Sequence, residues 1–193
     1  MNTIAPGYLI AAPNMVDPNF AKAVVLMAEH TVEGAIGFIV NKPTPVDLGL
    51  LLRSVDEDLA ELAETNGMAH LPVMLGGPVQ KHIAWVLYKR LPGAEPDEGA
   101  IAIGEELTVG ASIETLRSFI SGQRTGPFRV LLGYSGWGQK QLEGELFGGS
   151  WLPLDLVEGL TFNSEQDEIW NDAVRHLGLT PGAFTMGPSG GQA

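Results

Sequence analysis

VVLMAEHTVEGAIGFIV, residues 24–40, contains two apolar runs joined by a polar turn, and this stretch decides the fold. Val24 to Glu29 and Ala35 to Val40 each have the length and apolar content of a buried strand. His30 to Gly34 between them predicts a tight connection. Asn41-Lys42-Pro43 ends the second strand, because proline has no N–H to donate to a ladder and restricts the residue before it. The sequence therefore predicts a β-hairpin.

The pattern changes to a helical period between Asp47 and Glu64. Apolar residues recur at helical spacing, and acidic residues occupy the opposite face. The apolar positions are Leu48, Leu51, Leu52, Val55, Leu59 and Leu62. This segment predicts one helix or two short ones, with a solvated acidic face.

Short strands and one helix are expected in the middle of the chain. Strands are predicted at Val73 to Leu75, Ile83 to Tyr88 and Ala100 to Ile103, with a surface loop from Leu91 to Gly99. Ser112 is a predicted N-cap for a helix whose apolar side carries Ile113, Leu116, Phe119 and Ile120.

The C-terminal third contains the densest motifs. Phe128 to Leu132 predicts a central strand, Gly133 to Gly138 a glycine-rich turn, and Gln139 to Phe147 a short helix. Trp151 to Leu156 predicts an edge strand, because Pro153 lies within it. In the last helix, a Ser164 and Asp167 capping box precedes an apolar stripe, and Gly178 with Pro181 ends it. The stripe is Ile169, Trp170, Ala173, Val174 and Leu177.

These elements predict an α+β fold and not a doubly wound parallel sheet, because strands and helices do not alternate regularly and a hairpin comes first. No linker is long enough to separate two domains. We expect one compact domain over residues 1–186 and a flexible tail over 187–193.

The net charge of the chain argues against one class of partner. The 193 residues include 11 Lys and Arg against 23 Asp and Glu, a net charge of −12. Affinity for DNA comes mainly from cations that neutralise phosphates, so this field disfavours direct nucleic-acid binding. The basic residues are also dispersed along the chain, with only Lys89 and Arg90 adjacent.

Cysteine is absent, which excludes disulfides, zinc fingers and thiol nucleophiles. The first residues, MNTIAPGYLIAAPNM, have no basic region and are interrupted by Pro6, Gly7 and Pro13. We therefore expect no signal peptide. No apolar stretch approaches the roughly 20 residues that span a bilayer. The sequence predicts a cytoplasmic protein without membrane association.

Val130 to Gly138, VLLGYSGWG, resembles a nucleophile elbow, in which a strand, a Gly-x-Ser turn and a helix expose a serine. Asp172 and His176 follow in the order of a hydrolase triad. However, Trp137 stands where the elbow needs a small residue, and an HGGG-type oxyanion loop is not evident. Ser135 is therefore not a predicted nucleophile, and a structural glycine turn is the favoured interpretation.

The same glycines allow a second interpretation, an anion cradle before a helix N-terminus. The sequence has neither Gly-Lys-Ser/Thr nor the dinucleotide fingerprint, and Glu143 and Glu145 add negative charge. Packing around Trp137 is the alternative. The four histidines, His30, His70, His82 and His176, lack metal-ligand spacing, so no metal and no cofactor is predicted.

Several strings together resemble the YqgE/AlgH family of bacterial proteins. They are GAIGFIVNKP (34–43), VMLGGPV (73–79), LLGYSGWGQKQLEGEL (131–146) and the following Trp151-Leu152. PNMVDPNFAKAVVLMAEH (13–30) and Trp170 match in the same order, so the resemblance covers nearly the whole chain. The ending GPSGGQA departs from the Gly-His-Ala that is typical of the family.

The resemblance implies a compact α+β fold with a mixed, partly barrel-like sheet flanked by helices. One branch of the family is named as a regulator of alginate production, which is the source of a transcriptional regulator label. The resemblance supplies no catalytic residues. It also weakens Ser135 as a nucleophile, because the family motif accepts alanine at that position.

We expect a non-enzymatic regulatory protein that binds a protein partner or a small anionic ligand, without direct DNA readout. The alternative is a metabolite-binding or nucleotide-binding protein or an enzyme that uses a pocket near the glycine-rich segment. Lys42 is the expected anion contact there, and Trp137 the expected stacking surface. The candidate ligand-binding residues are Asn41, Lys42, Gly76, Gly77, Tyr134, Ser135, Trp137 and Gln141. The glycines and Asn41-Lys42 are equally typical of turns.

Overall fold

A computed structural model describes residues 3–162 and 165–181 of the chain. The strands in these ranges are β1 (Gly7–Ala11), β2 (Val24–Thr31), β3 (Gly34–Ile39), β4 (Pro43–Asp47), β5 (Pro72–Leu75), β6 (Val79–Lys89), β7 (Ile101–Ile103), β8 (Leu107–Gly110), β9 (Phe128–Gly138) and β10 (Trp151–Asp155). The helices are α1 (Leu48–Arg53), α2 (Glu57–Thr65), α3 (Ile113–Ile120), α4 (Gln141–Phe147) and α5 (Ile169–His176).

The predicted hairpin is confirmed as the antiparallel pair β2 and β3. Its neighbours extend it into one sheet with the order β10-β1-β2-β3-β9-β6-β8-β7. Strand β5 pairs with β9 in parallel, and β4 pairs with β5 antiparallel. The sheet is therefore mixed and flanked by helices, as predicted, and its strand path runs openly from β10 to β7 without closing.

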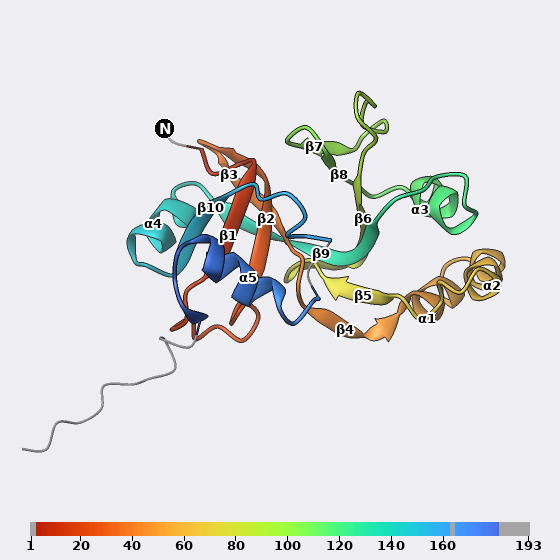
Figure 1. Ribbon diagram of the computed structural model, residues 1–193, viewed down its shortest axis with the longest axis horizontal. Coiled ribbons are helices and arrows are strands. Elements are labelled where there is room, and N and C mark those ends of the chain that lie inside the picture. Colours follow the sequence, from red (N-terminus) through yellow and green to blue (C-terminus); the bar gives the residue numbers. More distant parts are fainter. Residues whose placement is uncertain (1–2, 163–164, 182–193) are drawn as a thin grey trace, which may run out of the picture.

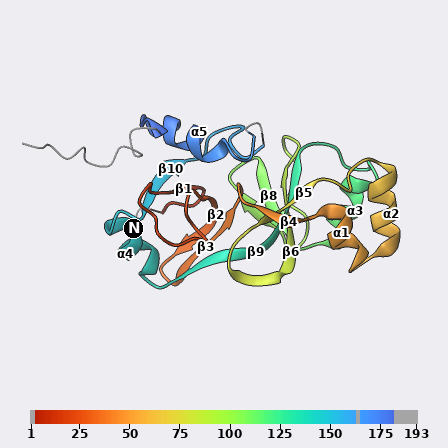
Figure 2. The same ribbon diagram turned by 90° about the horizontal axis from the view of Figure 1, so that it is seen from below.

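Strand β9 joins two halves of the molecule (Figure 1). We call β1, β2, β3, β10, α4 and α5 the Trp lobe, and β4 to β8 with α1, α2 and α3 the helical lobe. The first half of β9 pairs with β5 and β6, whereas its second half pairs with β3. Helices α1, α2 and α3 lie at one end of the molecule, and α4 and α5 lie around the other (Figure 2). Each lobe thus contains part of the same strand.

The buried apolar residues form three clusters, and β9 contributes to each. Val130 packs in the helical-lobe cluster, Leu131 in the central cluster, and Trp137 in the Trp-lobe cluster. The strand's period of two places Val130 and Leu131 on opposite faces, whereas Trp137 lies farther along β9, where the strand pairs with β3. The central cluster combines Tyr8 of β1 with Leu87 of β6, so it lies between the lobes.

The helices of the helical lobe begin where side chains cap them. Asp47, Asp56 and Ser112 accept hydrogen bonds from the backbone N–H groups three residues later, at the starts of α1, α2 and α3. Each cap satisfies a donor that the first helical turn leaves free. The segment from 47 to 64 is accordingly two short helices, one of the two predicted alternatives, and the Ser112 cap is confirmed.

Three strands were not predicted from the sequence. Strand β1 is buried on both faces, so it shows no alternation of polar and apolar residues. Strand β4 contains Pro43 and Pro45 and pairs with β5 at only two positions, Pro43 with Met74 and Asp47 with Pro72. Strand β8 has four residues and pairs with β6 and β7. Short strands and strands with proline give weak sequence signals.

The last helix is confirmed, with a different start. Helix α5 begins at Ile169, and the side chain of its N-cap Glu168 accepts no capping hydrogen bond from a backbone N–H of the helix. Ser164 of the predicted capping box and the predicted tail at 187–193 lie outside the described residues. Gly178, with φ of 74°, ends the helix in the left-handed conformation that glycine favours. No helix within residues 3–162 and 165–181 is long and apolar enough to cross a membrane.

Candidate functional site

The glycine-rich segment at Gly133 to Gly138 is a strand, so the predicted turn is wrong. The segment continues β9, and Ser135 to Gly138 pair with Gly37 to Gly34 of β3. Helix α4 begins only at Gln141, whose side-chain Oε1 accepts the Gly138 N–H at 3.1 Å. The strand, turn and helix of an elbow or an anion cradle therefore do not form here.

Ser135 is fully buried in this strand. Its hydroxyl donates to the Gly76 carbonyl oxygen at 3.3 Å, which links β9 to the end of β5. A serine in this position is part of the packing and is not exposed to a substrate.

Gly76 and Gly77 pack directly against the backbone of β9. A β-carbon at Gly77 would lie 2.1 Å from the carbonyl carbon of Tyr134, and one at Gly76 would lie 2.3 Å from the carbonyl oxygen of Gly133. Only glycine permits this approach. We call Gly76, Gly77 and Gly133 the glycine junction, because the backbones cross there between the two lobes.

Trp137 and Gln141 belong to a cluster centred on Glu145 of α4. The Glu145 Oε2 atom accepts the indole N–H of Trp137 at 2.9 Å and that of Trp151 at 2.8 Å. The Gln141 amide donates to Oε1 of the same carboxylate at 2.9 Å. Phe20 packs edge-on against Trp151, with ring centroids 5.3 Å apart. We call these five residues the Glu145 cluster, which fastens α4 to β9 and β10.

Asn41 and Lys42 lie elsewhere, beside α5. Asn41 is buried, accepts the Val24 N–H and donates to the Lys22 carbonyl, each at 2.8 Å. Lys42 donates to the Pro18 carbonyl at 3.0 Å. Burial lowers the pKa of Lys42, and Asp17 partly opposes this effect.

The predicted ligand-binding residues therefore fall into separate places. Asn41 and Lys42 line a hollow of about 310 Å³ together with Lys22 and Trp170. Gly76, Gly77 and Ser135 meet at the junction, whereas Trp137 and Gln141 join the Glu145 cluster. Tyr134 packs toward Trp85 of the central core, with ring centroids 6.4 Å apart. Because Tyr134 and Trp137 pack in different clusters, one pocket does not unite the set.

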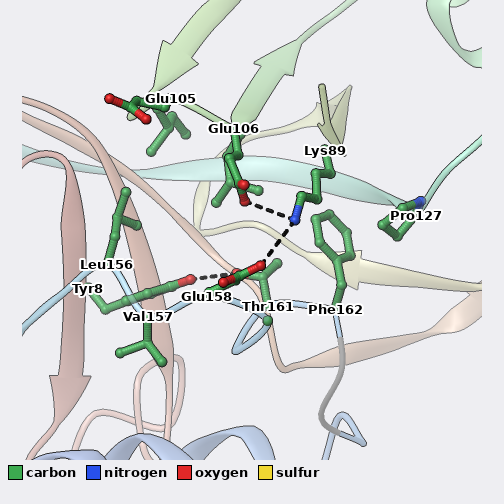
Figure 3. Close-up of a pocket in the computed structure, with 13 residues that line it drawn as sticks. Tyr8, Lys89, Glu105, Glu106, Pro127, Leu156, Val157, Glu158, Thr161 and Phe162 are labelled. Atoms are coloured by element: carbon green, nitrogen blue, oxygen red, sulfur yellow. Dashed lines mark hydrogen bonds and ion pairs between the residues drawn. The ribbon is translucent and has the colours of Figure 1, made fainter. Parts of the chain in front are cut away.

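A different hollow lies between the two lobes. Its volume is about 260 Å³, and the Trp lobe contributes Tyr8 and the segment from Leu156 to Phe162. The helical lobe contributes Lys89, Pro127 and the residues from Ile103 to Leu107 around the turn between β7 and β8. We call it the central cavity, and its side chains are shown in Figure 3. Small-molecule sites have volumes of about 300 to 1,000 Å³, so this cavity is just below the lower end of that range.

One wall of the central cavity carries a buried pair of hydroxyl groups. The Tyr8 hydroxyl and Thr161 Oγ1 lie 2.8 Å apart, and both residues are almost fully buried. Burial raises the pKa of Tyr8, while its hydrogen bond with Thr161 partly offsets the rise. Tyr8 therefore keeps its proton at neutral pH and offers a fixed polar group beside apolar walls.

The central cavity also carries charged groups, which come from both lobes (Figure 3). Lys89 Nζ lies 2.9 Å from Glu106 Oε2 and 3.6 Å from Glu158 Oε1, so it joins the lobes electrostatically. Its hydrogen bond to Glu106 raises the pKa of Lys89, and burial partly opposes this effect. Glu105 also lines the cavity, with its carboxylate directed away from Lys89 (Figure 3). The two carboxylates of Glu106 and Glu158 against one ammonium leave this end of the cavity negative.

Sequence reasoning did not find this cavity, because its residues come from distant segments without a motif. Lys89 was noted only for its neighbour Arg90, and residues 157–162 follow a predicted edge strand. The pairing of β1 with β10 and of β6 with β8 brings the segments together. In the described part of the chain, no group of three or more His, Asp or Glu side chains is placed to hold a metal ion.

Known proteins match this chain over nearly its whole length. A family model described as AlgH-like matches residues 8–182. A UPF0301 protein from Anaeromyxobacter sp. (strain Fw109-5) is 48% identical over 192 residues, covering 98% of this chain and 96% of the relative. A UPF0301 protein from Myxococcus xanthus (strain DK1622) is 32% identical over 187 residues, covering 97% of this chain and 98% of the relative.

Two solved structures have the same fold. The solution structure of the AlgH protein from Pseudomonas aeruginosa superposes with a TM-score of 0.75 at 28% identity, covering 100% of both chains. A crystal structure of a protein from Corynebacterium diphtheriae gives a TM-score of 0.67 at 23% identity, covering 90% of this chain and 87% of that one. The second likeness concerns the fold alone. The resemblance inferred from the sequence strings is thereby confirmed.

Proposed function

This chain belongs to the AlgH-like family, and we propose that it is a non-enzymatic regulatory protein whose central cavity binds a small ligand. One observation carries this proposal. The cavity combines apolar walls with a few polar groups, and it lies where the two lobes meet. A ligand there contacts both lobes, so its binding energy can alter the way they present their surfaces to a protein partner.

The lining indicates the chemistry of the ligand. Leu107, Leu156, Val157 and Phe162 offer apolar contacts, and the Tyr8 and Thr161 hydroxyls offer hydrogen bonds. The excess of carboxylates over ammonium groups favours a positively charged head. We therefore propose a small amine with an apolar body, which competes with Lys89 for Glu106 and Glu158.

The arrangement of side chains supports binding in preference to catalysis. A nucleophile needs an adjacent base and access to substrate, whereas Ser135 is buried and donates to a backbone carbonyl. The carboxylates Glu106 and Glu158 are already paired with Lys89. These pairings suit a ligand that exchanges with an existing ion pair.

Charge supports regulation through partners in preference to direct DNA readout. The net charge is −12, and the candidate site carries more acidic than basic groups. We expect no sequence-specific binding of purified protein to duplex DNA at about 150 mM salt. Tight binding to one DNA sequence in that buffer would contradict this part of the proposal.

A titration with benzylamine tests the cavity. We expect saturable chemical-shift changes at residues 103–107 and 156–162, and much weaker changes with the uncharged benzyl alcohol. Val157→Trp fills the cavity and is expected to abolish the changes. Val32→Trp adds the same side chain at an exposed turn and is the matched control. Equal binding by both variants, or no saturable change in the wild-type protein, would overturn the proposal.

A second candidate function is supported by the hollow beside α5. Lys22 and Lys42 both line it, and Lys22 Nζ lies 5.8 Å from the centre of the Trp170 ring. Two ammonium groups against the one carboxylate of Asp167, beside an aromatic ring, suit a small anionic metabolite, the ligand class expected from the sequence. Here Trp170 takes the place that the sequence analysis gave to Trp137.

A thermal-shift screen of phosphorylated metabolites tests this alternative. We expect a stabilised melting midpoint with at least one compound, and loss of that shift in Lys42→Ala. Lys81→Ala removes an exposed lysine outside the hollow and controls for net charge. A flat screen, or equal shifts in both variants, would count against an anion site at Lys42.

A further inference from the structure

The side chain of Arg129, in β9, lines a groove next to the central cavity. Its Nε–H donates to the Thr161 carbonyl at 3.0 Å, and its guanidinium carbon lies 6.0 Å from the centre of the Phe162 ring. These two contacts hold the side chain half-buried against the segment that follows β10. The Nε contact uses one of the five guanidinium donors, so the terminal nitrogens stay available to an acceptor.

Arg129 has no carboxylate partner within residues 3–162 and 165–181, because none of the ion pairs found there within 4.0 Å involves it. The ranges outside these residues contain neither Asp nor Glu. Four other arginines do pair with carboxylates: Arg53, Arg117, Arg124 and Arg175. Burial lowers the pKa of Arg129, and the more distant Glu165 partly opposes this effect. A half-buried cation without a close counter-ion favours an incoming anion.

The groove has a volume of about 210 Å³ and mostly apolar walls. Leu71 and Pro72 form one part, Phe128 and Phe162 another, and the Gln166 side chain adds an amide. Among the described residues that line this hollow, Arg129 is the one with a charged side chain. We call this hollow the Arg129 groove. It shares Pro127 and Phe162 with the central cavity, so the two sites are neighbours.

We infer that the Arg129 groove binds the carboxylate of a small molecule that has a compact apolar body. A guanidinium presents parallel N–H groups that match the two oxygens of a carboxylate. Low surrounding polarity strengthens this charge-assisted contact. One arginine balances one negative charge, whereas a doubly charged phosphate would remain undercompensated between apolar walls.

This inference does not depend on the proposed function. The central cavity is negative and is tested with an amine, whereas the Arg129 groove is positive and is tested with an acid. If benzylamine failed to bind, the inference about the Arg129 groove would still stand. If benzoate failed to bind, the proposal for the central cavity would still stand. The two sites are therefore separable by the charge of the probe.

Titration of the wild-type protein with sodium benzoate tests the inference. We expect saturable changes in the Arg129 Nε–Hε signal and at residues 71–72 and 128–130. Benzamide, which has the same ring without the charge, is expected to bind far more weakly. Inorganic phosphate is expected to bind more weakly than benzoate, because it cannot use the apolar walls. Phosphate binding as strong as that of benzoate would overturn the inference.

Two variants of Arg129 sharpen the test. Arg129→Gln is expected to weaken benzoate binding at least about tenfold, and Arg129→Lys to weaken it by less, because the charge remains without the planar fork. Arg53→Gln removes an exposed arginine from α1 and is the matched control for net charge. Equal affinity in Arg129→Gln and wild type would overturn the inference. So would an unchanged Arg129 signal in the wild type, a readout that does not depend on either variant folding.

Discussion

The two lobes reach stability by different means, although they share one strand. The helical lobe uses amphipathic helices with side-chain caps at Asp47, Asp56 and Ser112. The Trp lobe uses two tryptophans that donate to one carboxylate, Glu145. Caps are local features of sequence, whereas the Glu145 cluster brings together β9, α4 and β10. The comparison shows that the most conspicuous motif of the chain stabilises a lobe, while the central cavity lies between lobes and has no motif.

The largest expected effect is at the glycine junction, which both lobes need. Gly77→Ala would place a methyl group 2.1 Å from the Tyr134 carbonyl carbon, so the crossing backbones must move apart. We expect a loss of at least about 4 kcal/mol in the free energy of unfolding. Urea denaturation followed by tryptophan fluorescence measures it. Gly144→Ala, in α4 with no atom within 4 Å of the added carbon, is the control and should be neutral or slightly stabilising.

The second-largest expected effect concerns a cluster that stabilises the Trp lobe alone. Glu145→Ala leaves the buried indole N–H groups of Trp137 and Trp151 without their acceptor. We expect a loss of about 3 kcal/mol, because each hydrogen bond to a charged group is worth about 1.5–3 kcal/mol and the effects overlap. Glu61→Ala removes an exposed glutamate from α2 and should change stability by less than about 0.5 kcal/mol. Equal losses would show that the two indoles do not depend on Glu145.

A smaller effect is expected from a cap in the helical lobe. Asp56→Ala removes the acceptor for the Leu59 N–H at the start of α2. The expected loss in the free energy of unfolding is about 1–2 kcal/mol. Asp56→Asn keeps a capping oxygen and should retain most of the stability. The ion pair between Asp56 and Arg117 contributes little to stability, because both side chains are partly exposed. Calorimetry compares the two variants, and a similar loss in both would mean that charge outweighs capping.

The smallest effect concerns pH. Asp97 accepts two hydrogen bonds from Arg124, at 2.8 and 2.9 Å, which together with Thr115 lower the pKa of Asp97 from 3.8 to about 2. A folded-state pKa below the unfolded one adds stability above pH 3.8 and loses it as pH falls toward 2. After allowance for solvent screening, the contribution is about 1 kcal/mol. Asp97→Asn should flatten the dependence of the melting temperature on acid pH, and an unchanged slope would contradict this assignment.

The sequence predicted the elements that have their own periodic pattern. The sequence predicted the hairpin of β2 and β3, the helices of the helical lobe and α5. Apolar spacing and helix caps depend only on residues that are close together in the chain. Strand β9 was predicted only to Leu132. Its second half contains Gly133, Gly136 and Gly138, residues that usually end strands, and here it is held by pairing with β3. Tertiary pairing overrode the local glycine signal.

The candidate site was harder to predict for a physical reason. Ser135, Trp137 and Gln141 stood out because they lie in or next to one dense glycine-rich motif, yet such motifs also serve packing. Lys89, Glu106 and Glu158 are common residues from three distant segments, and only the folded sheet brings them within ion-pair distance. Lys42 remains a predicted anion contact, now with Lys22 and Trp170 as its neighbours.

Strand β9 also restricts how the chain can change length during evolution. Successive side chains of a strand alternate between faces, so a residue inserted after Gly133 would leave Leu131 in place and turn Ser135 and Trp137 to the wrong side. The rest of each lobe would keep its sequence, yet the side chains that β9 contributes to the Trp lobe would point to the wrong face of the sheet. Insertions should therefore accumulate in the exposed loop at 91–99, while the number of residues between Phe128 and Gly138 stays constant among descendants of this chain.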